Sequence, residues 1–137
     1  MVKQGFWIGN RDWWIMGYYN IKTQDNLNDI FNVLLASGSE TEKARQAVKV
    51  LSKENTGYTF TNFIEHSTIV CASKASSYDE MFSTITHEIK HVTEHISEYY
   101  NVDSKSEKAA YLQGEISKQM YKAIALTICP ICNCEHK

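Results

Sequence analysis

Residues 77–100 predict one long amphipathic helix, and this segment constrains the fold more than any other part of the sequence. Its apolar side chains recur at three- and four-residue spacing and cover about a third of the helix circumference, at 100° per residue. They are Met81, Phe82, Ile85, Ile89, Val92 and Ile96. Ser76 or Ser77 is the expected N-cap, and Asp79 and Glu80 follow in the first turn, where the helix dipole favours negative charge. Such a helix must bury its apolar stripe against another layer of the fold.

The rest of the chain predicts an α+β domain. Aromatic and β-branched residues on both sides of Gly9-Asn10-Arg11-Asp12 predict an N-terminal β-hairpin of residues 6–8 with 13–19. The other expected elements are a helix at 25–36, a helix from Ser39 or Thr41 to about Leu51, strands at 57–61 and 67–71, and a last helix at 105–127. We therefore expect a small antiparallel or mixed sheet packed on about four helices, as one domain over residues 1–128 with a cysteine-rich tail at 129–137.

Composition narrows the classes of partner. The chain has 137 residues, is 43% hydrophobic and carries a formal net charge of −2, with no basic run long enough to follow a phosphate backbone. We therefore expect no nucleic-acid partner. No stretch reaches the roughly 18 apolar residues that span a bilayer, and the N-terminus lacks the apolar core of a signal peptide. These features predict a soluble, cytoplasmic protein with no membrane partner.

The segment His87-Glu88-Ile89-Lys90-His91 is the sharpest chemical signal. Two histidines at i and i+4 lie on one helix face, about 6 Å apart along the axis, and can share one ion. Both fall off the apolar stripe. Imidazole ligands beside a carboxylate favour zinc, and Glu88 could act as general base towards an activated water. The alternative is that both histidines lie at the edge of the core, bonded to nearby carboxylates.

A catalytic zinc of this type needs a third protein ligand, and Glu107 is the first candidate. It follows His91 by 16 residues, and an antiparallel return of the next helix would bring it beside the histidines. The competing interpretation is a capping box, Ser104-x-x-Glu107, in which the glutamate bonds the backbone N–H of Ser104. Weaker ligand candidates are Asp103, Glu94 and Glu98.

Two positions after the motif argue against other ligand sets. His95 lies about 12 Å from His87 along a straight helix and cannot reach the same ion, so we expect it to be exposed or near the site. The metzincin pattern requires a histidine six residues after His91, where this chain has Ser97.

His87-Glu88-x-x-His91 followed by Glu107-x-x-Ala110-Tyr111-x-x-Gly114 resembles the gluzincin type of zinc metallopeptidase. More narrowly, it is similar to small, mostly uncharacterised metallopeptidases encoded by bacteriophages and bacteria, over roughly residues 66–121. The resemblance implies a zincin-like minimal domain, with His87, His91 and Glu107 as zinc ligands and Glu88 as base.

The same resemblance implies a peptide or protein substrate that pairs with a sheet edge strand, here about residues 67–72. Tyr111, on the Glu107 face, and Tyr78 are candidates for stabilising an oxyanion. A bacteriophage origin would place the protein in the host cytoplasm or the virion. The alternative function is a non-catalytic structural or host-interaction protein on the same scaffold.

The cysteines do not suggest a disulfide framework and suit a reducing compartment. Cys129-Pro130-Ile131-Cys132 has the spacing of a zinc knuckle, and Cys134 and His136 could complete a second metal site. A flexible, reduced tail is the stronger interpretation, because the second pair follows too closely in sequence. Cys71 is expected to be a small buried residue of its strand.

Overall fold

The N-terminal hairpin forms as predicted, from β1 (Val2–Ile8) and β2 (Trp13–Ile21) in antiparallel register. The computed structural model describes residues 1–9 and 12–135, so Asn10 and Arg11 of the predicted turn lie outside the described residues. Trp13, Ile15 and Tyr19 of β2 are fully buried. The hairpin therefore supplies part of the hydrophobic core.

Two further strands complete a four-stranded mixed sheet in the order β1-β2-β4-β3. β4 (Ser67–Ser73) pairs parallel with β2 and antiparallel with β3 (Gly57–Asn62). Six of the seven β4 residues are buried, as expected for an interior strand covered on both faces. β3 is an edge strand, with one side free of strand pairing.

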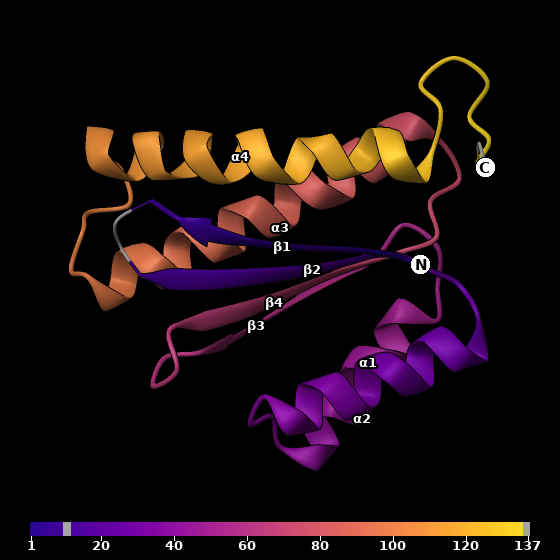
Figure 1. Ribbon diagram of the computed structural model, residues 1–137, viewed down its shortest axis with the longest axis horizontal. Helices are drawn as coiled ribbons and strands as arrows, with labels where there is room; N and C mark the ends of the chain where they lie inside the picture. Colours follow the sequence, from indigo (N-terminus) through magenta and orange to yellow (C-terminus); the bar gives the residue numbers. More distant parts are fainter. Residues whose placement is uncertain (10–11, 136–137) are drawn as a thin grey trace.

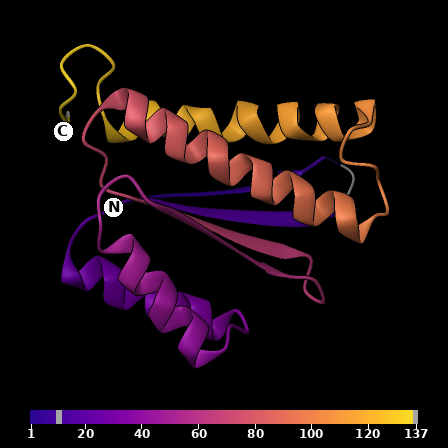
Figure 2. The ribbon, with the colours of Figure 1, turned by 180° about the vertical axis from the view of Figure 1, so that it is seen from behind.

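The helices form one layer on each face of the sheet (Figures 1 and 2). One layer is α1 (Gln24–Ala36) with α2 (Thr41–Leu51), and the other is α3 (Tyr78–Tyr99) with α4 (Glu107–Thr127). Each layer encloses its own hydrophobic cluster against the sheet. The predicted α+β class is confirmed, with four helices around a mixed sheet.

Helix starts were predicted with mixed success. Ser77 caps α3, because its side chain accepts a hydrogen bond from the Glu80 N–H at 3.1 Å. The N-cap of α2 is Glu40, without a side-chain cap bond, so neither Ser39 nor Thr41 has that role. Within the described residues, no helix combines the length and apolarity needed to cross a membrane.

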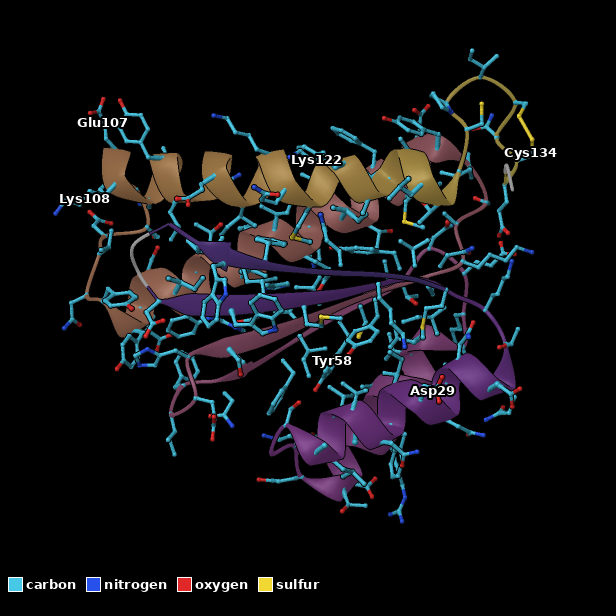
Figure 3. The ribbon with its side chains drawn as sticks, in the orientation of Figure 1. Asp29, Tyr58, Glu107, Lys108, Lys122 and Cys134 are labelled. Atoms are coloured by element: carbon cyan, nitrogen blue, oxygen red, sulfur yellow. A yellow bond between two sulfur atoms is a disulfide. The ribbon has the colours of Figure 1, made fainter. Side chains whose placement is uncertain are left out.

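The alternation of side chains along β3 positions the candidate site. Tyr58 and Phe60 pack into the cluster beneath α1 and α2, and Figure 3 shows Tyr58 on that side of the sheet. Gly57, Thr59 and Thr61 point to the opposite face, towards α3. The face of β3 that meets α3 therefore carries only a glycine and two hydroxyl side chains.

Candidate metal centre

His87 and His91 lie on α3 with their imidazoles turned towards each other. The two Nε2 atoms are 3.1 Å apart. A tetrahedral zinc with Zn–N bonds of 2.0–2.1 Å would hold two such nitrogens about 3.3 Å apart. Together with the Glu88 carboxylate, their ligand atoms lie within 4.8 Å of one another. The donor set and its spacing therefore fit a zinc ion, with His87 and His91 as ligands.

Glu88 is buried beneath the histidines, with 3% of its surface exposed. The Thr59 hydroxyl of β3 donates a hydrogen bond to its Oε1 at 2.9 Å. Gly57 makes room for the carboxylate, because a Cβ at this position would lie 2.7 Å from both Glu88 Cγ and Oε2. Two β3 residues thus fix the carboxylate beside the imidazoles.

Burial raises the pKa of Glu88, because the charged form loses its hydration. The hydrogen bond from Thr59 and the nearby His91 and His87 act in the opposite direction and lower this pKa, but burial has the larger effect. A carboxylate with a raised pKa is a stronger base than an exposed one, which suits proton transfer near neutral pH.

The raised pKa predicts that Glu88→Gln stabilises the metal-free protein at neutral and alkaline pH. Ionising Glu88 costs more in the folded chain than in the unfolded chain, so its destabilising contribution is absent well below pH 4.5. That contribution grows as pH rises from the unfolded pKa through the higher folded pKa. We expect the variant to melt a few degrees above wild type at pH 8 and level with it at pH 4, by circular dichroism. Equal melting temperatures at both pH values would contradict the raised pKa.

A groove of about 550 Å³ runs between α3 and β3 at this site. Residues 56–59 form one side, His87, Glu88, His91 and His95 form the other, and Val50 of α2 contributes. The strand predicted to receive a peptide, residues 67–72, is β4, which is paired on both sides and cannot accept another strand. The free edge beside the motif belongs to β3.

Glu107, the predicted third ligand, lies away from the histidines. It is the exposed first residue of α4, and Figure 3 shows it pointing away from the sheet. The capping box does not form either, because the N-cap is Ser106, whose hydroxyl accepts from the Ala109 N–H at 3.2 Å. Among the described residues, the metal-binding group consists of His87, Glu88 and His91 without Glu107.

Glu107 lies in solvent because of the way α4 packs. Its apolar face turns towards the sheet and α3 and consists of Ala109, Leu112, Ile116, Met120 and Ala123. The opposite face is left in solvent. Tyr111 is 75% exposed and does not line the groove, and a Cβ at Gly114 would meet nothing within 4 Å. Gly114 therefore does not mark a close approach of α4 to another element.

The weaker candidates also lie outside the metal-binding group. Asp103 and Glu98 are exposed. Glu94 Oε2 is 4.0 Å from His91 Nδ1, the ring nitrogen that does not face His87. An acidic side chain on that side favours the tautomer whose Nε2 is free for a metal. Tyr78, the second candidate for stabilising an oxyanion, is the first residue of α3 and packs against the core cluster.

The cysteine tail differs from the expectation of free thiols. Cys132 and Cys134 form a disulfide, which leaves Cys129 as the free thiol of the three. A disulfide offers no thiolate to a metal, so this state lacks two of the ligands proposed for a second site. His136, the fourth, lies outside the described residues. Cys71 is fully buried in β4, as expected.

Sequence reasoning missed Gly57 and Thr59. Their signal is the alternation Gly57-x-Thr59-x-Thr61 between two aromatic residues, which marks a strand face too small and polar to be a core face. The residue that each position meets depends on the packing of β3 against α3.

No protein-family model, curated protein or solved structure matches this chain.

Proposed function

We propose that this chain is a zinc-dependent metallopeptidase of gluzincin type. The observation that carries the proposal is the pair of imidazole Nε2 atoms at 3.1 Å above a buried carboxylate. His87 and His91 bind the metal, and Glu88 is the general base. The Nε2 atoms of the two rings face each other, and the only carboxylate contact of the pair among the described residues is that of His91 Nδ1 with Glu94 at 4.0 Å.

The chemistry follows from the positions of these groups. A zinc ion held here would polarise a carbonyl oxygen and lower the pKa of a coordinated water to about 7. Glu88 accepts the proton of the attacking water and then transfers it to the leaving amine. Thr59 and Gly57 hold the carboxylate in place for both steps. Burial of Glu88 keeps its carboxylate basic enough for the first step.

The surroundings support a peptide substrate and a zincin-like arrangement. The helix that carries the motif follows directly on β4, and the edge strand β3 borders the groove. An extended peptide could add to the free edge of β3 through backbone hydrogen bonds, which would place its amides beside His87 and His91.

Metal analysis with a proteolysis assay tests this proposal. We expect about one zinc per purified chain, new termini in reduced and alkylated serum albumin by mass spectrometry, and loss of cleavage on chelation with recovery after zinc is returned. Glu107→Gln is the matched control, and because Glu107 is remote its zinc content and cleavage should equal wild type. A chain without bound metal would refute the proposal.

A non-catalytic metal-binding role, as in a structural or host-interaction protein, is the second candidate. The observation that favours it is the position of Glu107, which leaves two histidines and one carboxylate as the metal-binding group. If Glu88 itself bound the metal, it could not act as base. Stoichiometric zinc without cleavage of any unfolded protein would support this role.

A further inference from the structure

A chain of polar contacts crosses the sheet and ends at the groove. The Trp13 indole N–H of β2 donates to the Thr68 hydroxyl of β4 at 3.0 Å. Thr68 Oγ1 lies 3.0 Å from Thr61 Oγ1 of β3, which lies 2.7 Å from His95 Nδ1 of α3. His95 lines the groove beside His91. Four side chains, each from a different element, thus form one connected series.

The direction of these hydrogen bonds follows from the first donor. An indole nitrogen can only donate, so Thr68 accepts from Trp13 and keeps its own hydroxyl proton free to donate. Thr68 is 1% exposed, and its other contact is Thr61. The arrangement that gives the buried Thr68 proton an acceptor in this series is donation to Thr61, and Thr61 then donates to His95 Nδ1. This makes Nδ1 an acceptor and leaves the proton of a neutral imidazole on Nε2.

The surroundings also keep this ring uncharged. Burial lowers the pKa of His95, because the charged ring loses its hydration, and the neighbouring His91 lowers it further. Glu98 and Glu94 act in the opposite direction, with smaller effect. At neutral pH His95 therefore carries one N–H, on Nε2, and the residue lines the groove.

The distance of His95 from the metal-binding histidines sets what it can reach. His95 lies one helical turn beyond His91, about 6 Å along the axis. An extended peptide advances about 3.3 Å per residue, so that distance corresponds to about two residues. β3 follows the same direction along α3, because Thr59 contacts Glu88 and Thr61, two residues later, contacts His95.

From this geometry we infer that His95 Nε2–H binds a backbone carbonyl of an extended peptide substrate, about two residues from the scissile bond. This inference rests on the proposed peptidase function. Trp13, Thr68 and Thr61 are positioning residues that fix the tautomer. The ligand class is a neutral carbonyl acceptor, and the site favours substrates that extend at least two residues beyond the cleaved bond.

The first test is the tautomer of His95 in the full-length, zinc-loaded chain. Long-range ¹H–¹⁵N correlation spectra should show the proton on Nε2 and an unprotonated Nδ1. In Thr61→Val, which keeps the shape but removes the hydroxyl, the two tautomers should exchange. A proton on Nδ1 in the wild-type chain would overturn the inference, with or without peptidase activity.

The second test uses the peptide that surrounds the site cleaved in albumin, shortened stepwise from each end. His95→Phe should raise KM at least tenfold for the full peptide, with a small change in kcat. It should have no effect once the peptide ends before the bound carbonyl, and His95→Gln should recover part of the loss because its amide also donates. Equal effects on long and short peptides would overturn the inference.

The two tests separate failure of this inference from failure of the proposed function. Cleavage with a His95 variant that behaves as wild type refutes the substrate contact alone. Absence of all cleavage, with the expected tautomer present, refutes the peptidase function and with it the peptide carbonyl as ligand.

Discussion

Glu88→Gln is expected to lower hydrolysis by about 10²–10⁴-fold while zinc content stays at the wild-type level. Glutamine has nearly the shape of glutamate, and its carbonyl oxygen can still accept from Thr59, which lies 2.9 Å from Oε1. It cannot accept the proton of the attacking water. Because the proposal assigns the metal to His87 and His91, the change should remove the base and leave both ligands in place. Cleavage rates and elemental analysis on the same preparation measure both outcomes.

Two matched variants make this result specific. His87→Ala should lose zinc and hydrolysis together, which separates the role of a ligand from that of the base. Glu98→Gln changes an exposed glutamate of the same helix and should leave both quantities unchanged. Cleavage by Glu88→Gln at the wild-type rate would contradict the proposed mechanism, and loss of its zinc would make Glu88 a ligand.

Local sequence patterns predicted the helices and strands well where these depend on interactions between residues close in the sequence. The apolar stripe of α3 and the cap at Ser77 depend on neighbouring residues. The cap was confirmed, and the stripe is buried except for Phe82, which is 42% exposed. The strands at 57–61 and 67–71 were also located closely. Which of them lies at the edge is a question of sheet topology, and β4 became interior because it pairs parallel with β2. The continuous apolar run at residues 69–72 is typical of an interior strand, whereas residues 57–61 alternate, so part of that choice was readable within the strands.

Part of the site was predictable for the same reason. His87, Glu88 and His91 lie within five residues of one helix, so helical geometry alone brings them together. Glu107 belongs to another helix, and its position depends on which face of α4 turns inward. Burying Leu112, Ile116 and their apolar neighbours fixes that face, and this places Glu107 in solvent. Hydrophobic packing therefore outweighed the spacing of the motif.

Gly57→Ala is expected to reduce hydrolysis by about 10²-fold, although residue 57 carries no chemistry of its own. A Cβ there would lie 2.7 Å from Glu88 Cγ and 2.8 Å from Cδ, closer than real contacts allow. The Glu88 side chain must then move away from Thr59 and from the position where it can reach the water. A displacement near 1 Å at a reacting group costs roughly this factor. Zinc content should remain, since the three atoms nearest the new methyl group all belong to Glu88.

The control for this variant is Gly114→Ala, because a Cβ at that exposed position of α4 meets nothing within 4 Å. It should leave hydrolysis unchanged and raise stability by up to about 1 kcal/mol, since alanine favours the helix. Steady-state rates, zinc content and thermal melts of both variants provide the comparison. Full activity in Gly57→Ala would show that Glu88 tolerates displacement, and the space left by Gly57 would then have no part in positioning the base. A loss of rate with zinc retained would instead show that an edge strand without ligands or acids determines where the carboxylate acts.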